Sequence, residues 1–153
     1  MDDAHFHLLL NHLPVILPLI GIVILIEGLL LNSQIVIKTA YFILIFAAMA
    51  TIPIVATGEG AEKAVEKLNG VDEQLFKTHE EISETFAILC YVLSGIAIFG
   101  LWANFYRKSF SKIINFTIIA VCIFTLIFAE ITSIAGGEMR HSEIRSIYAI
   151  KNI

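Results

Sequence analysis

The stretch LLLNHLPVILPLIGIVILIEGLLL, residues 8–31, decides the fold, because its only acidic or basic residue besides His12 is Glu27. A helix that crosses a bilayer needs about 20 mostly apolar residues. Inside lipid every backbone polar group must be satisfied, and a helix does this within one segment. The stretch therefore predicts a permanent transmembrane helix. It is longer than the apolar core of a cleaved signal peptide, and the residues before it, MDDAHFH, are acidic, whereas a signal peptide begins with positive charge.

Three further apolar runs of similar length follow, at residues 36–56, 82–106 and 113–136. The whole chain is 58% hydrophobic and only 16% charged, with a mean hydropathy of +0.84. A soluble domain is nearer a quarter charged. The links after the first and third runs are short, which favours antiparallel hairpins. We therefore predict one domain, residues 1–153, that is all-α and forms an antiparallel four-helix transmembrane bundle in the lipid bilayer.

Other features of the composition narrow the class of protein further. The net charge of −4 gives no basic footprint for nucleic acid. The two cysteines, Cys90 and Cys122, each lie near the centre of an apolar run. Buried thiols of this kind behave as small packing residues. We expect neither a disulfide nor a metal site from this pair.

The long link between the second and third runs covers residues 57–81. Within it, GAEKAVEKLNG at 60–70 places Ala and Val on one helical face and Glu and Lys on the other. This pattern predicts an amphipathic helix at the membrane interface, ended by Asn69 and Gly70. No helix breaker follows before the third run, so the third helix is expected to begin near Asp72 and to stand out of the membrane.

An even number of spans places the N-terminus, the long link and the C-terminus on one side of the membrane. All five histidines lie on these pieces: His5, His7, His12, His79 and His141. Three distant segments thus each bring at least one imidazole to the same face. Neutral imidazole is a common metal ligand, so the topology predicts a cofactor or metal site there.

His12 is the histidine that we expect to face inward, because it lies about one turn inside the first span and precedes Pro14. Ionisable residues at membrane depth are costly and mark functional sites. For His5 and His7 a ring among the lipid headgroups is the simpler interpretation, although His7 stays a candidate ligand.

Carboxylates near the histidines suggest a metal centre. Glu130 lies about two turns inside the fourth span, where it is either paired or protonated. Glu138 and His141 have the Glu-x-x-His spacing of di-metal bundles. Spans two and four both end in A-x-G-E, at residues 56–59 and 135–138, either as a weak tandem repeat or as common helix-ending chemistry. The candidate ligands for Fe, Zn or Cu are His12, His79, His141, Glu59, Glu80, Glu130 and Glu138.

The second and fourth helices have glycines, and so no side chains, at positions 58, 60, 136 and 137, which lie at the level of the histidines. Their plain role is to end helices. They also suggest room for a flat macrocycle between the first and third helices, with histidines on both sides of its iron. Arg140 suits a propionate partner. The candidate residues for haem b are His7, His12, His79, His141 and Arg140.

Four stretches, HFHLLLNHLP, ATGEGAE, THEE and IAGGEMRHSEI, resemble an uncharacterised bacterial family of small four-span membrane proteins. The resemblance covers nearly the whole chain and implies haem binding and a place in the bacterial inner membrane. It carries over to His7 or His12, Glu59, Gly136, Gly137 and His141. The opening lacks the family's first proline, and NHLP replaces the usual ending, which leaves open which histidine is the ligand.

The leading hypothesis is a membrane electron-transfer protein with haem b, or another metal, held by His12 and His79. Its partners would be quinone or a soluble cytochrome. The N-terminus has no basic residue to hold it inside, which favours a periplasmic histidine face, although a bare count of Lys and Arg favours the reverse. The alternatives are a Zn or non-haem Fe enzyme and a structural subunit of a respiratory or transport complex or homo-oligomer.

Overall fold

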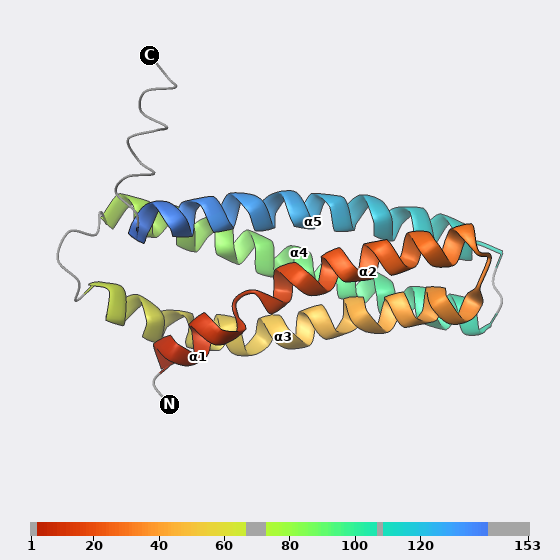
Figure 1. Ribbon diagram of the computed structural model, residues 1–153, viewed down its shortest axis with the longest axis horizontal. Coiled ribbons are helices and arrows are strands. Elements are labelled where there is room, and N and C mark those ends of the chain that lie inside the picture. The colour runs from red at the N-terminus through yellow and green to blue at the C-terminus, as the bar shows by residue number, and fades with distance from the viewer. Residues whose placement is uncertain (1–2, 67–72, 107–108, 141–153) are drawn as a thin grey trace, which may run out of the picture.

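The computed structural model describes residues 3–66, 73–106 and 109–140. Their regular elements are five α-helices: α1 (Asp3–Leu10), α2 (Leu13–Leu30), α3 (Gln34–Glu66), α4 (Glu73–Phe105) and α5 (Ser111–Arg140) (Figure 1). Four stretches are long and apolar enough to cross a membrane, namely His5–Leu30, Gln34–Gly58, Gln74–Phe105 and Ser111–Glu138. The predicted all-α transmembrane bundle is therefore confirmed.

The helices alternate in direction and form a closed ring of neighbours. α2 packs on α3, α3 on α4, α4 on α5, and α5 on α2, while the short α1 packs on α3. Figure 1 shows that α1, the end of α3, the start of α4 and the end of α5 lie at the same end of the bundle. We call this the histidine end, and the opposite end, with both short links, the basic end. The helices that carry His5, His7 and His79 therefore share one end of the bundle, as expected, while His141 lies outside the described residues.

The first apolar run is broken into two helices at Asn11 and His12, where the sequence predicts one continuous helix. Pro14 has no backbone N–H to donate to the carbonyl of Leu10, which removes a hydrogen bond at this point. His12 instead caps α2, and its carbonyl accepts the amides of Val15 and Ile16. The break lets α1 change direction and pack on α3.

The glycines near the histidine end do not end their helices. α3 continues through Gly58 and Gly60 to Glu66, so residues 61–66 extend α3 and do not form a separate interfacial helix. α5 likewise continues through Gly136 and Gly137 to Arg140. A glycine inside a helix costs about 1 kcal/mol, which long helices with many packed residues tolerate. α4 begins at Glu73, close to the predicted start.

α3 and α4 are much longer than the membrane is thick. Each has 33 residues, which is about 50 Å of helix against a hydrocarbon layer of about 30 Å. At the basic end α2 and α3 are joined by a tight turn, in which Asn32 adopts the left-handed conformation with φ of 50°. The excess of about 20 Å therefore projects at the histidine end.

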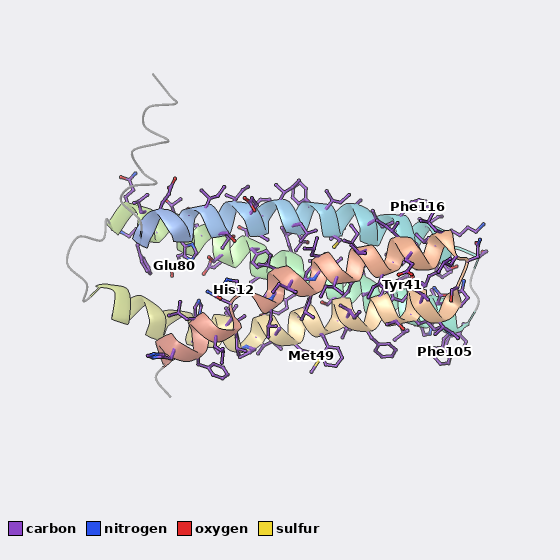
Figure 2. The ribbon with its side chains drawn as sticks, viewed as in Figure 1. His12, Tyr41, Met49, Glu80, Phe105 and Phe116 are labelled. Carbon is purple, nitrogen blue, oxygen red and sulfur yellow. The ribbon has the colours of Figure 1, made fainter. Side chains whose placement is uncertain are left out.

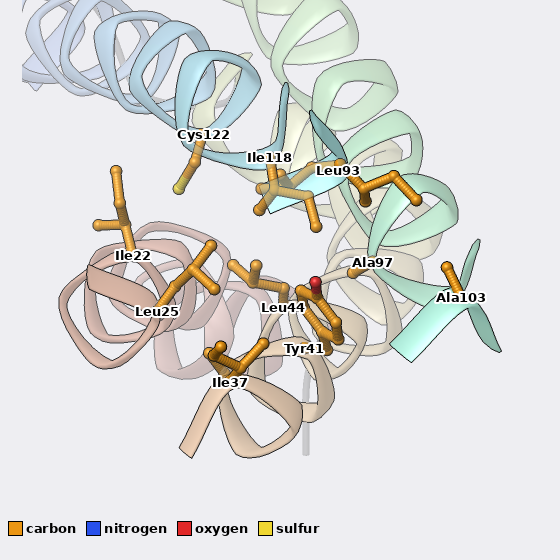
Figure 3. Close-up of a cluster of buried hydrophobic side chains, with 12 residues drawn as sticks. Ile22, Leu25, Ile37, Tyr41, Leu44, Leu93, Ala97, Ala103, Ile118 and Cys122 are labelled. Atoms are coloured by element: carbon orange, nitrogen blue, oxygen red, sulfur yellow. The ribbon is translucent and has the colours of Figure 1, made fainter. Parts of the chain in front are cut away.

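The core of the bundle consists of aliphatic side chains and small residues. Leu25, Leu44, Leu93 and Ile118 are fully buried near the centre (Figure 3). Large apolar side chains such as Phe116 and Leu30 cover the outside, where a lipid bilayer would contact them. Without a hydrophobic difference between core and lipid, close packing of small residues holds such helices together.

A buried polar cluster connects three helices near the basic end. The Tyr41 hydroxyl on α3 donates to the amide oxygen of Asn115 on α5, and Asn104 on α4 donates its Nδ2 to the Tyr41 oxygen at 3.3 Å. All three side chains are buried. Polar groups buried in a membrane protein are stabilising when every member has a partner, so this cluster sets how α3, α4 and α5 meet.

Replacing Tyr41 by Phe is expected to lower the free energy of unfolding by about 1–2 kcal/mol, because two buried amides lose their shared partner. Thermal unfolding in detergent measures the change. Thr117→Val is the control, since the Thr117 hydroxyl is exposed and bonds only the Ile113 carbonyl of its own helix. Equal stability of Tyr41→Phe and the wild type would contradict the prediction.

Candidate cofactor site at the histidine end

Two histidines from distant parts of the sequence come together at the histidine end. His7 lies on α1 and His79 on α4, and both side chains are half-buried. The helices that carry them, α1 and α4, reach the same end of the bundle (Figure 1). α3 and α5 complete the surroundings, with Thr57 beside His7 and Gly136 against His79.

The His7 ring is held in one orientation by α3. Its Nδ1 lies 3.1 Å from the carbonyl oxygen of Ile54, and because a carbonyl only accepts, Nδ1 carries the hydrogen. The Thr57 hydroxyl oxygen lies 3.4 Å from the same nitrogen and donates its own hydrogen to the Pro53 carbonyl. The other ring nitrogen, Nε2, is therefore unprotonated in the neutral ring. This is the usual arrangement of a histidine that binds metal through Nε2.

The His79 ring is held on one side by its own helix. Its Nε2 lies 3.3 Å from the Ser83 hydroxyl oxygen, and that hydroxyl donates to the His79 carbonyl at 2.6 Å. The Ser83 oxygen therefore accepts from Nε2–H, which leaves Nδ1 with the lone pair. Nδ1 is buried and has no hydrogen-bond partner in the described part of the chain. A buried nitrogen left unsatisfied costs about 1–3 kcal/mol, which a ligand or a closer approach of the Thr132 carbonyl on α5 would offset.

α5 makes room for the His79 ring by means of Gly136. A Cβ at position 136 would lie 3.1 Å from Cε1 and 3.5 Å from Nδ1 of His79. The Thr132 carbonyl, one turn earlier on α5, is a further hydrogen-bond acceptor within reach of the ring. Gly136 therefore gives space to the imidazole itself, whereas the sequence suggested space for a macrocycle. At Gly58, the matching glycine on α3, a Cβ would meet nothing within 4 Å.

Gly136→Ala is expected to push the His79 ring aside and to lower the free energy of unfolding by about 1 kcal/mol, because the methyl group overpacks the contact. Gly58→Ala is the matched control and should be neutral or stabilising by up to about 1 kcal/mol, since alanine favours helix. Thermal unfolding of both variants in the same detergent checks this. A Gly136→Ala protein as stable as Gly58→Ala would contradict the packing argument.

His12 does not face the bundle interior, contrary to the sequence-based expectation. Its side chain is exposed, and its Nδ1 shares a hydrogen bond with the side-chain oxygen of the neighbouring Asn11. Figure 2 shows it at the break between α1 and α2. The break caused by Pro14 changes the direction of the chain here, so the helical spacing that predicted an inward ring does not apply. His5 is exposed as well.

The predicted carboxylate ligands are spread over the outside of the bundle. Glu80, labelled in Figure 2, and Glu130 are both exposed. Glu130 lies about 26 Å along α5 from Ile113. That distance brings its carboxylate close to the far edge of the hydrocarbon layer, where headgroups and water can solvate it. Glu130 therefore needs no buried partner, and the structure does not join it to the two histidines.

The structure describes the side chain of only one of the other predicted ligands, Glu138. Glu138 is half-buried near the end of α5 and has an interaction partner. Glu59 and Arg140 lie in α3 and α5, but their side chains fall outside the described part of the structure, and so does all of His141. Among the side chains that are described, no group of three or more His, Cys, Asp and Glu could hold a metal ion.

The sequence interpretation missed the residues that hold the two rings. Ser83 follows His79 by four positions, so helical spacing alone could have placed its hydroxyl beside the ring. The Ile54 carbonyl and Thr57 had no such signal, because α1 and α3 meet only in the tertiary structure. Cys90 and Cys122 are free and buried, as expected for packing residues.

Comparison with known proteins adds no identity: the chain matches no family model, no curated protein and no solved structure.

Proposed function

We propose that this chain is a membrane-anchored electron-transfer protein that holds haem b between His7 and His79. One observation carries the proposal. Within the described residues, each of these two imidazoles has one nitrogen held by a hydrogen bond with measured geometry and a second nitrogen without one, and the helices that carry them share the histidine end.

The donor set fits haem better than a bare metal ion. The porphyrin supplies four nitrogens, so two axial imidazoles complete the iron, whereas a structural zinc site takes four protein ligands and a catalytic one takes three. The buried, unpartnered Nδ1 of His79 is the kind of atom that a bound cofactor would satisfy. Arg140 in the last turn of α5 is the candidate propionate partner.

The chain's own residues would orient the ligands and set their basicity. The Ile54 carbonyl fixes the tautomer of His7, and the Ser83 hydroxyl fixes that of His79. Haem, when bound, supplies one-electron transfer. Nδ1 of His79 is buried, which keeps water from competing for it, whereas the His7 ring is half-buried.

The site lies where a water-soluble partner could reach it, because α3 and α4 project about 20 Å beyond the hydrocarbon layer. A soluble cytochrome therefore fits better than quinone, which would approach from within the lipid. We place this end on the periplasmic side of a bacterial inner membrane, since the opposite end has a dense group of Lys and Arg.

The test is a visible absorption spectrum of the full chain, purified in detergent from cells supplied with haem precursor. We expect a Soret band, the spectrum of a low-spin iron with two axial imidazoles, and one haem per chain. Titration of the purified protein with haemin should reach the same ratio. A protein with no Soret band after this titration would overturn the proposal.

A metal centre without porphyrin is the second candidate. It is favoured by the position of Glu138, two residues after the Gly136 that packs on His79, and by its half-buried side chain. His79, Glu138 and His141 would then hold Zn or Fe, with a carboxylate as base. Elemental analysis separates the candidates: stoichiometric metal with no porphyrin band supports the metal enzyme.

A further inference from the structure

The basic end of the bundle has cations and almost no acidic residues. Its cations are Lys38, Arg107, Lys108 and Lys112, while residues 28–58 and 85–129 contain no Asp or Glu. Glu27, exposed on α2, is the nearest acid in the sequence. In the described part of the chain neither Lys38 nor Lys112 has an ion pair. This end therefore presents positive charge that the described protein does not neutralise.

Aromatic side chains gather on α4 near this end of the bundle, together with Phe110 just before α5. The Trp102 ring stacks on Phe99 at 5.4 Å between centroids and meets Tyr106 at 5.6 Å, and Phe99 also stacks on Phe110 at 6.0 Å. Trp102 is 45% exposed. Trp and Tyr gather where a membrane meets water, because one part of each ring system is apolar and another is polar. This cluster therefore marks the level of the lipid headgroups.

Lys38 is held at this same level by an aromatic contact. Its Nζ lies 4.5 Å from the centroid of the Phe105 ring, which is itself 69% exposed (Figure 2 labels Phe105). A ring that attracts the ammonium group keeps it at the outer edge of α3 and α4, beside apolar surface. An ammonium group in that position, which forms no ion pair within the described residues, is suited to bind an anion that has an apolar body.

We infer that this surface binds an anionic phospholipid. The headgroup phosphate lies at the Lys38 ammonium, and the acyl chains run along the exposed faces of α3 and α4. Charge complementarity supplies the preference for an anionic headgroup, and each basic residue at the membrane surface contributes about fivefold in affinity. The aromatic cluster sets the depth of the site in the membrane, since it holds this part of α4 at the level of the headgroups.

Trp102 makes the test local, because it is the only tryptophan in the chain. The full chain is placed in mixed micelles with brominated phosphatidylglycerol or brominated phosphatidylcholine, and the quenching of tryptophan fluorescence is measured. We expect half-maximal quenching at a mole fraction of phosphatidylglycerol about fivefold lower than that of phosphatidylcholine, with the ratio falling as salt is added.

Two variants locate the effect. Lys38→Gln is expected to reduce the ratio at least about twofold, while Lys77→Gln, an equal loss of charge at the exposed start of α4 on the histidine end, should leave it unchanged. Circular dichroism of each variant confirms that the helices remain. Equal quenching by both lipids in the wild type overturns the inference, and a full preference in Lys38→Gln overturns the assignment to Lys38.

Discussion

His79→Ala is expected to lower the haem occupancy of the purified protein to less than about a tenth of the wild-type value, because it removes one of only two axial ligands. His7→Ala should do the same. The measurement is the ratio of the Soret absorbance to protein concentration after titration with haemin, together with the spin state of any bound iron. A single remaining imidazole would give a high-spin spectrum in place of a low-spin one.

His12→Ala is the matched control, because this ring is exposed and bonds only Asn11. Its haem occupancy and spectrum should equal those of the wild type. Ser83→Ala tests the support of the ligand and should weaken haem binding by about tenfold or more without abolishing it. If His12→Ala lost the cofactor while His7→Ala kept it, the assignment of the axial ligands would be wrong.

Gly28→Ala is expected to cause the largest loss of stability, about 3 kcal/mol, by forcing α2 and α3 apart. A Cβ at this position would lie 2.8 Å from the backbone nitrogen of Ile37 and 3.2 Å from the carbonyl carbon of Val36. These are backbone atoms at the start of α3, just after the tight turn, and they cannot rotate away. Thermal unfolding in detergent measures the loss.

Two other glycines give graded controls for this prediction. At Gly95 a Cβ would meet nothing within 4 Å, so Gly95→Ala should be neutral or slightly stabilising. At Gly21 the nearest atom is the side-chain Cδ2 of Leu44, at 2.5 Å, which can shift. Gly21→Ala should therefore fall between the two. A Gly28→Ala protein as stable as Gly95→Ala would show that the hairpin contact is not a constraint.

The transmembrane architecture could be predicted from the sequence because bilayer physics leaves few choices. A long apolar run such as residues 8–31 must be helical in lipid, whatever it packs against, although the break at Asn11 and His12 divides it into two helices. Short links after the first and third spans then make antiparallel hairpins, and an even number of spans brings His7 and His79 to one side. Composition and length alone were sufficient for these conclusions, because they concern each segment and its solvent.

Which side chains meet at the histidine end was decided only by the tertiary structure. The direction of a ring depends on a local break and on the neighbouring helix, so Pro14 turned His12 outward while Ile54 and Thr57 on α3 fixed His7 inward. The role of Gly136 depended in the same way on the His79 ring, which belongs to another helix. A contact between two distant segments cannot be read from the sequence of either segment alone. Such contacts determine which residues form the candidate site.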